Sequence, residues 1–190
     1  MSSDLAPEIV EPLLAGRLGR PYRFVAECRS TQLLLGEDEP EGTTVATDHQ
    51  TEGRGRLGRV WEDAPGRGLL FSVQLRPTLH MAIWPELSLV AGEAVAAALP
   101  ADARLSHPND VMVDGRKIAG ILPEASTGRV RLGIGINVNQ TADELPEETV
   151  KPTTSLRIET GKDWDRGILL AAILLELGTR YDAWQRRATA

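Results

Sequence analysis

Short stretches of alternating or β-branched residues predict several strands along the chain. From Phe71 onward, residues 69–75 alternate apolar and polar side chains, which is the two-residue period of a strand. Residues 43–47 and 130–136 are rich in β-branched and aliphatic side chains, and we expect two further strands there. The apolar pattern therefore favours a sheet as the main element of the fold.

One hairpin is indicated by Asp114-Gly115, which stands between two apolar stretches. A type I′ turn needs positive φ at both central residues, and the pair Asp-Gly suits it. The returning strand then begins beside this turn and carries Lys117 near its start. The sequence therefore predicts a lysine held in a fixed place by a tight turn.

Two longer helices are predicted from apolar residues at helical spacing. Residues 87–98 carry such a pattern, with Pro85 suited to the first turn and Pro100 ending the helix. A final helix is expected over about 163–185, and a short one after Ser30, whose hydroxyl suits an N-cap. Strands outnumber helices, so the expected fold class is α+β, with helices on one face of a sheet.

The 190 residues have the size of one domain. Residues 1–21 are expected to form a short helix and a loose N-terminal lead-in. Residues 49–68, rich in glycine and arginine, read as a long functional loop, and residues 139–153 as a second loop.

The amino-acid composition limits which binding partners and which cellular compartment we expect. The formal net charge of −6 argues against general nucleic-acid binding, which needs a clustered positive excess. The single Cys28 cannot form an internal disulfide, and one cysteine with three histidines argues against a structural zinc site. There is no signal-peptide pattern, and the longest apolar run, 168–175, is too short to cross a bilayer. We expect a cytoplasmic protein without nucleic-acid or membrane partners.

The first candidate site is Gly53-Arg54-Gly55-Arg56-Leu57-Gly58-Arg59, followed by Trp61. Glycines let a backbone approach a ligand with unshielded N–H groups, and arginines offer forked donors that match phosphate. Trp61 adds a flat face on which a purine could stack. The spacing is not that of a P-loop. A flexible solvated loop, or an Arg-Gly segment that binds RNA, is the alternative at this point.

Two further clusters carry candidate chemistry. Asn109 and Asp110 suit a ribose hydroxyl or a magnesium ion, and Lys117 could meet the charge that develops as a carboxylate attacks an α-phosphate. The alternative is ordinary turn chemistry with an exposed strand lysine. Hydroxyls and amides that could bind the polar head of a ligand, or serve as caps and surface groups, form the third cluster: Ser30, Thr31, Gln32 and Gln50.

The order of these segments resembles the catalytic domain of biotin protein ligases. The matching motifs are Ser30-Thr31, Gln50 to Trp61, Pro108-Asn109-Asp110, Lys117 to Leu122, Gly133 to Asn139, Thr154-Ser155-Leu156 and Glu159-Thr160-Gly161. The resemblance covers residues 22–187, which we expect to be the catalytic domain, and many motifs in one order are more specific than any single one. It implies a mixed or antiparallel sheet flanked by helices, related to the class II aminoacyl-tRNA synthetase fold.

The resemblance also implies an ATP-dependent ligase that acts in two steps. Biotin's carboxylate attacks the α-phosphate of ATP, which gives biotinyl-adenylate and pyrophosphate. A lysine of a biotin carboxyl carrier protein then attacks this mixed anhydride. ATP, Mg²⁺ and biotin are the implied cofactors and substrate, and the protein is expected to be a monomer or a homodimer.

Residue roles follow from the same resemblance. Lys117, Arg54 and Arg56 are the implied catalytic residues, with Lys117 bridging biotin's carboxylate and the phosphate. Biotin would contact Ser30, Thr31, Gln32, Gln50, Arg54, Gly55, Arg56, Lys117 and Gly120. ATP would contact Arg56, Trp61, Asn109, Asp110, Lys117 and Asn137, with Asp110 as the magnesium ligand.

The chain departs from the family pattern in three places. Ser106-His107 stands where the family usually has Lys-Trp, so a cation near the phosphates is missing. Glu52 stands where a small neutral residue is usual. The chain ends at Ala190, where many members continue into a small β-barrel domain, and we do not expect that domain here. We also expect no N-terminal DNA-binding domain. The alternatives are a non-catalytic or weakly active protein that binds biotin or its adenylate, and a ligase for lipoate or octanoate.

Overall fold

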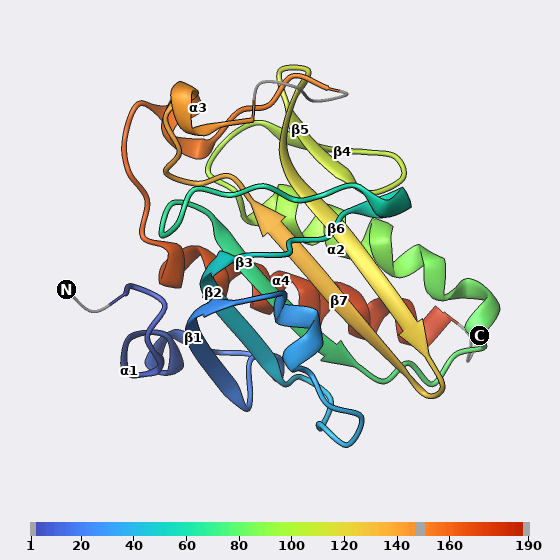
Figure 1. The fold of residues 1–190 in the computed structure, drawn as a ribbon. Coiled ribbons are helices and arrows are strands. Elements are labelled where there is room, and N and C mark those ends of the chain that lie inside the picture. The colour runs from blue at the N-terminus through green and yellow to red at the C-terminus, as the bar shows by residue number, and fades with distance from the viewer. Residues whose placement is uncertain (1–2, 147–150, 188–190) are drawn as a thin grey trace.

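A single seven-stranded sheet organises the computed structural model, which describes residues 3–146 and 151–187. Its strands are β1 (Tyr22–Cys28), β2 (Thr44–Gln50), β3 (Leu69–Leu75), β4 (Ala103–Ser106), β5 (Asp110–Val113), β6 (Arg116–Ser126) and β7 (Arg129–Ile136). The order across the sheet is β1-β2-β3-β7-β6-β5-β4 (Figure 1). Strand β1 runs parallel to β2 and all other neighbours are antiparallel, so the sheet is mixed.

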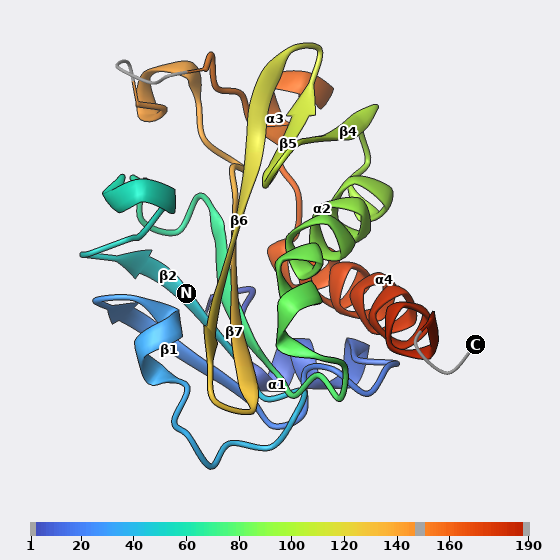
Figure 2. The same cartoon turned by 90° about the vertical axis from the view of Figure 1, so that its right-hand side faces the viewer.

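Helices cover one face of this sheet. The helices are α1 (Pro7–Val10), α2 (Leu87–Ala98), α3 (Leu156–Thr160) and α4 (Arg166–Arg186), and Figure 2 shows α2 and α4 together on one side of β6 and β7. Leu87 and Val95 of α2 and Leu170 of α4 are fully buried in the core. Removing this apolar surface from water drives the packing of the two layers. The α+β class with helices on one face is thereby confirmed.

The stretch Met81–Ala98 is long and apolar enough, by composition alone, to match a membrane span. In the structure it consists of the 3₁₀ helix Met81–Glu86 followed by α2, which packs against α4 and the sheet. It is therefore a core segment of the fold.

The predicted strands and the hairpin are confirmed, with small shifts at their ends. Strand β3 has the predicted bounds, β7 starts one residue earlier, and β2 continues to Gln50, two residues into the segment expected as a loop. Asp114 and Gly115 have φ of 47° and 76°, as a type I′ turn requires. Lys117 therefore lies one residue into the returning strand β6.

Helix beginnings differ more from the expectation. Pro85 lies inside the 3₁₀ helix Met81–Glu86 instead of starting α2. In this 3₁₀ helix Trp84 is buried, and its indole N–H donates to the Leu79 carbonyl at 2.9 Å. The short helix after Ser30 is a 3₁₀ helix, Thr31–Leu34, and the Ser30 side chain does not cap it.

The N-terminal lead-in is folded against the same core instead of being loose. Leu5, Val10 and Leu18 are at most 1% exposed and belong to the main hydrophobic cluster. Asp4 receives two hydrogen bonds from the Arg166 guanidinium at the start of α4, one of them 2.9 Å long. This segment therefore links the N-terminus to the last helix.

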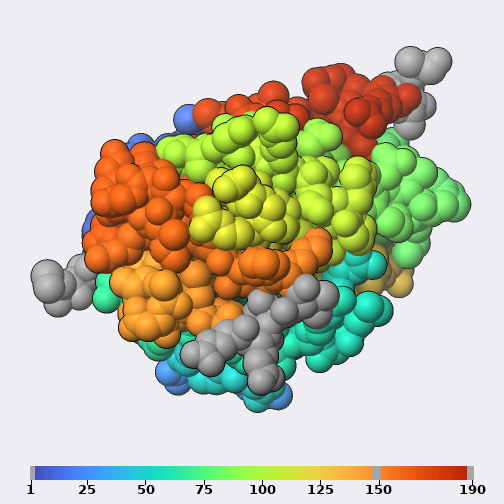
Figure 3. Space-filling view, turned by 90° about the horizontal axis from the view of Figure 1, so that it is seen from above, coloured from blue at the N-terminus to red at the C-terminus, as the bar shows by residue number. Residues whose placement is uncertain are grey.

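A short segment that we call the strap, residues 151–154, crosses the start of β6. The backbone N–H of Lys117 donates to the Pro152 carbonyl (2.7 Å), and the Thr154 N–H donates back to the Lys117 carbonyl (2.9 Å). Figure 3 shows the orange part of the chain that contains the strap against the yellow-green β5–β6 hairpin. The strap thus fixes a second chain segment beside Lys117.

Candidate active site

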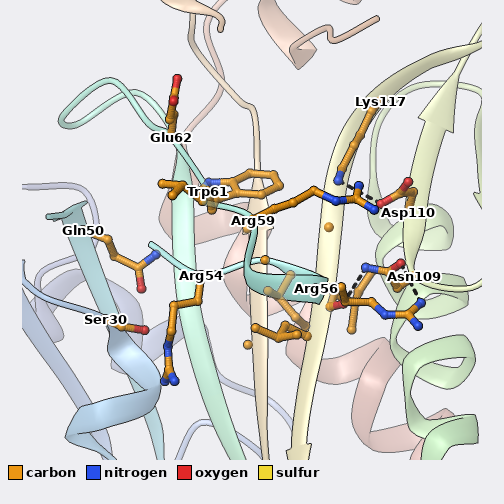
Figure 4. A pocket seen from close by; sticks show the side chains of 18 of the residues that line it. Ser30, Gln50, Arg54, Arg56, Arg59, Trp61, Glu62, Asn109, Asp110 and Lys117 are labelled. Carbon is orange, nitrogen blue, oxygen red and sulfur yellow. Dashed lines mark hydrogen bonds and ion pairs between the residues drawn. The ribbon is translucent and has the colours of Figure 1, made fainter. Parts of the chain in front are cut away.

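The loop of residues 51–62 lies on the face of the sheet opposite α2 and α4 (Figure 2), and it borders a cavity of about 700 Å³. Its walls come from the end of β2, the loop of residues 51–62, strands β5, β6 and β7, and the strap (Figure 4). The structure brings together every residue predicted for the site, and all line this cavity: Ser30, Thr31, Gln32, Gln50, Arg54, Gly55, Arg56, Trp61, Asn109, Asp110, Lys117, Gly120 and Asn137.

Two glycines form the floor of the cavity. Gly120 of β6 and Gly135 of β7 are directly paired across the strands, and both face the Trp61 indole. A Cβ atom on Gly135 would lie 2.6 Å from the indole ring, and one on Gly120 would lie 2.9 Å from it. Only glycine at these positions lets a flat ring rest on the sheet. The indole N–H is buried and has no hydrogen-bond partner among the described residues.

The polar, uncharged end of the cavity is built by residues of the 3₁₀ helix Thr31–Leu34 and of the sheet. Gln50 Oε1 accepts from the Thr31 backbone N–H at 2.9 Å, and the hydroxyls of Thr31 and Ser72 lie 2.7 Å apart. Ser30, Thr31 and Gln32 are each 3% exposed. Small polar groups at such burial suit an uncharged ligand head with several hydrogen-bonding atoms.

Within this group, the Gln32 side chain joins the 3₁₀ helix to the sheet. Its Nε2 donates to the carbonyls of Leu122 (2.9 Å) and Arg131 (3.1 Å), and its side chain covers Gly133. These bonds fasten the 3₁₀ helix onto β6 and β7. The Gln32 amide nitrogen is therefore already occupied, whereas its side chain still forms part of the wall.

The charged end of the cavity is centred on Asp110. Lys117 Nζ lies 2.8 Å from Asp110 Oδ1, and Lys151 Nζ lies 2.7 Å from Asp110 Oδ2. Partial burial alone would raise the pKa of Asp110, but the hydrogen bonds and charges of the two lysines outweigh it and hold that pKa below its usual value. Lys117 Nζ also lies 5.5 Å from the centroid of the Trp61 ring, within reach of a cation–π interaction.

Asn109 and Asn137 orient the walls on this side. Asn109 donates to the Ile121 carbonyl (3.0 Å) and accepts from Arg56 Nη1 (3.2 Å). Asn137 is 5% exposed, and its Nδ2 donates to the Thr154 carbonyl at 3.0 Å. Asn109 therefore tethers Arg56 at the cavity, and Asn137 holds the strap.

The glycine–arginine loop is closed into a narrow hairpin. The backbone N–H of Trp61 donates to the Gly53 carbonyl (3.0 Å), and the backbone N–H of Gly55 donates to the Arg59 carbonyl (2.8 Å). A Cβ atom on Gly53 would lie 2.2 Å from the Trp61 carbonyl oxygen, so only glycine allows this closure. The Gly55 N–H, expected to be free for a ligand, is therefore used by the loop itself.

Arg54 differs from the expectation for a catalytic cation. Its guanidinium pairs with Glu124, with Nη1 to Oε1 at 2.9 Å, and Figure 4 shows it pointing away from Lys117. Glu124 projects from β6 close to this arginine, and a paired guanidinium is held there. Glu52 is likewise engaged elsewhere: it pairs with Arg29 at 2.6 Å, so its carboxylate does not neutralise the loop arginines.

Two cationic side chains of the cavity, those of Lys151 and Arg59, had no role assigned from the sequence. Lys151 lies in a segment expected only as a loop, 41 positions away from its partner Asp110, so no local spacing could reveal it. Arg59 stands in the quoted motif but had no role assigned; Figure 4 shows its side chain crossing the cavity toward Asp110. The repeated arginines of the loop were the available signal for Arg59.

A magnesium ion does not fit Asp110 as the structure arranges it. Each of its carboxylate oxygens contacts a lysine ammonium, so a dication would meet two positive charges at contact distance. The described residues also contain no group of three or more His, Cys, Asp or Glu that could hold a metal ion. The geometry gives no support to the predicted metal ligand.

Two known proteins are similar to this chain in sequence. The bifunctional ligase/repressor BirA of Bacillus spizizenii is 41% identical over 157 residues, which are 78% of this chain and 48% of that protein. The biotin–[acetyl-CoA-carboxylase] ligase of Mycobacterium tuberculosis is 37% identical over 185 residues, which are 90% of this chain and 68% of that protein. The chain thus spans about half the length of the first of these relatives.

Solved structures show the same fold. The biotin protein ligase from Aquifex aeolicus in complex with biotin and ATP has a TM-score of 0.78 and 38% identity, over 86% of this chain and 71% of that chain. The model of the Biotin/lipoate A/B protein ligase family matches residues 26–140, which include the glycine–arginine loop, Asp110 and Lys117. The chain therefore belongs to the biotin/lipoate A/B protein ligase family.

Proposed function

We propose that this chain activates biotin as its adenylate and transfers the biotinyl group to a lysine of a carrier protein. The position of Lys117 carries the proposal. Its ammonium is fixed by the hairpin turn and by Asp110 at 2.8 Å, in the charged end of a cavity whose other end is polar and uncharged. The neutral polar head of an acid matches the uncharged end, and a nucleotide matches the charged end. The carboxylate of the acid and the phosphates of the nucleotide can then meet beside Lys117.

In the first step, a carboxylate oxygen of biotin attacks the α-phosphorus of ATP. The new C(O)–O–P bond forms as the bond from the α-phosphorus to the bridging oxygen breaks, and pyrophosphate leaves with the electron pair. Negative charge gathers on the phosphate oxygens, where a fixed ammonium is most effective. Lys117 is proposed to supply it, with Arg56 on the nucleotide side and Arg54 moving from Glu124 when the phosphate is present.

The remaining residues are proposed to bind and orient the two substrates. Ser30, Thr31 and Gln50 would hold the ureido head of biotin, and Gln32 would wall it in. Gly55 would let the biotin chain approach the backbone, and Gly120 would contribute by leaving room for the Trp61 ring and Lys117 beside that chain. Trp61 would lie against adenine, while Asn109, Asp110 and Asn137 line the nucleotide side. Because Asp110 does not fit a protein-held magnesium ion, no step is assigned to one.

In the second step, the neutral ε-amine of a carrier lysine attacks the acyl carbon of the adenylate. The C–N bond forms, the C–O bond to the phosphate breaks, and AMP leaves with that oxygen while the amine loses a proton. The names of the relatives support a carboxylase-type carrier, because one of them is a biotin–[acetyl-CoA-carboxylase] ligase.

Biotinylation of a carrier domain tests this proposal. The chain, ATP and biotin are incubated with a biotin carboxyl carrier domain, and with the same domain whose target lysine is replaced by arginine. We expect a mass increase of one biotinyl group on the first domain and none on the second. An unmodified first domain under conditions where a known ligase modifies it would contradict the transfer step.

A further inference from the structure

Two arginines from different parts of the fold pair with the carboxylate of Glu124. Arg131 of β7 stands directly opposite Glu124 of β6 in the sheet, and its Nη2 lies 3.3 Å from Glu124 Oε2. Arg131 Nη1 also donates to the Gln32 carbonyl at 3.2 Å. The Glu124 carboxylate is therefore held on the sheet by the neighbouring strand.

The second arginine comes from the glycine–arginine loop. Arg54 places two guanidinium nitrogens on the two carboxylate oxygens of Glu124, Nη1 on Oε1 at 2.9 Å and Nη2 on Oε2 at 3.2 Å. Such forked pairs are among the stronger side-chain interactions. Of the described residues, Arg54 lines both the cavity and a neighbouring groove bordered by residues 51–60, whereas Glu124 lines only the groove. The pair therefore draws the Arg54 guanidinium away from the cavity.

The position of the loop does not depend on this pair. The backbone N–H of Trp61 closes the hairpin on the Gly53 carbonyl, and the Trp61 ring rests on the glycine floor. Arg56 Nη1 donates to Asn109 at 3.2 Å and ties the other part of the loop to the cavity wall. The Arg54 side chain can therefore turn from the groove to the cavity while the loop stays in place.

We propose that Glu124 is a positioning residue that sets the affinity for anionic ligands by competing with them for Arg54. This inference rests on the proposed adenylation function, in which Arg54 moves to the phosphate. A guanidinium whose two nitrogens contact Glu124 cannot make the same contacts to a ligand anion. Part of the binding free energy is therefore used to separate Arg54 from Glu124. Arg131 remains beside the carboxylate, so Glu124 is not left as an unpaired charge.

Ligand binding by Glu124→Gln tests the proposal, because loss of the competing charge should tighten binding, whereas damage to the fold would weaken it. Titration calorimetry compares a non-hydrolysable analogue of biotinyl-adenylate with biotin methyl ester, which carries no negative charge. We expect the affinity for the analogue to rise about two- to fivefold, the size of a partly exposed ion pair, with the affinity for the ester unchanged. An analogue affinity that is unchanged or lower, or an equal rise for the ester, would overturn the proposal.

Two controls separate the release of Arg54 from a general change of charge. Glu52→Gln removes the same charge from the loop, but Glu52 pairs with Arg29 at 2.6 Å, so the analogue affinity should stay at the wild-type value. In the Arg54→Ala background, Glu124→Gln should have no further effect, because the guanidinium for which Glu124 competes is absent. A rise of the same size in either control would show that the effect does not pass through Arg54, and the proposal would fail.

Pyrophosphate release separates this inference from the proposed function. If the wild-type chain binds the analogue but shows no biotin-dependent release, adenylation fails, while the comparison with Glu124→Gln still decides the role of Glu124. If release is normal and Glu124→Gln binds the analogue no more tightly, the function stands and this inference fails. A wild-type chain that does not bind the analogue overturns both.

Discussion

Lys117 owes its position to three separate constraints. The Asp114-Gly115 turn sets where β6 begins, the strap bonds to the Lys117 backbone on both its N–H and its carbonyl, and Asp110 holds the ammonium. Sequence reasoning could find the first constraint because it is local. The strap and the Asp110 contact join distant segments, and a hydrogen bond between distant residues leaves no periodic signal.

Lys117→Ala should abolish the activation of biotin and leave the fold intact. The variant loses the ammonium at the reacting phosphate, and loss of one preorganised group of this kind costs roughly a hundredfold or more in rate. Its backbone bonds to the strap do not depend on the side chain. Pyrophosphate exchange measures the rate, and circular dichroism with a thermal melt serves as the control for folding. A normal exchange rate would remove the catalytic role.

Gly135→Ala should weaken ligand binding with little loss of stability. The added methyl would lie 2.6 Å from the Trp61 ring, so the ring must shift away from the floor to make room. We expect biotin and nucleotide affinity to fall at least roughly tenfold, as for one well-placed clash in a packed site. Gly36→Ala is the matched control, since its Cβ would lie 3.7 Å from the nearest side chain, Glu39. If calorimetry finds that both variants bind with wild-type affinity, ligand binding does not depend on the Trp61 ring resting on Gly135.

At the scale of elements, the local pattern of apolar and polar residues predicted the strands and helices whose bounds depend on neighbouring residues. The alternation over 69–75 predicted the bounds of β3, and the helical repeat over 87–98 predicted the bounds of α2. The pattern did not reveal β1, which pairs in parallel with β2, or β4 at the far edge. Every residue that the motifs predicted lines one cavity. The pairing of Arg54 with Glu124 was not predicted, because Glu124 stands 70 positions away in the sequence. Such partners are set by the packing of the sheet.

Asn137→Ala tests whether the strap serves the site. The variant leaves the buried Thr154 carbonyl without its donor, and we expect a loss of about 1–3 kcal/mol in the free energy of unfolding. The KM for ATP should rise as well, because the strap is hydrogen-bonded to the backbone of Lys117. Asn139→Ala is the control: it removes a 2.9 Å bond to the Trp164 carbonyl and should lower stability without raising that KM. Equal effects on KM in both variants would speak against a role for the strap.

For the whole molecule, the N-terminal segment, the sheet and the last helix meet at Glu41. Its carboxylate accepts from Arg17 at 2.6 Å, from the Tyr181 hydroxyl at 2.8 Å and from the Arg76 N–H at 3.0 Å. Burial alone would raise the pKa of Glu41, but these donors outweigh it and lower that pKa. One side chain thus connects segments that are far apart in the sequence.

Glu41→Gln should change how stability depends on pH. A carboxylate with a lowered folded-state pKa contributes stability above its unfolded-state pKa, and this contribution is lost as the pH falls through the folded-state value. At neutral pH we expect the variant to be less stable by about 1–2 kcal/mol. Below roughly pH 4.3, the ordinary glutamate value, the difference should shrink. Urea unfolding at several pH values measures it, and a constant difference would contradict the assignment.

The central claim is that one cavity joins biotin to the α-phosphate of ATP, and pyrophosphate release tests it most directly. Release from ATP is measured with the wild-type chain alone, with biotin, and with lipoate as the control acid. The account predicts release that depends on biotin and is absent with lipoate. Release with lipoate only would assign the cavity to the other acid of the family. No release with either acid, while calorimetry still detects bound biotin, would contradict catalysis and leave a binding protein.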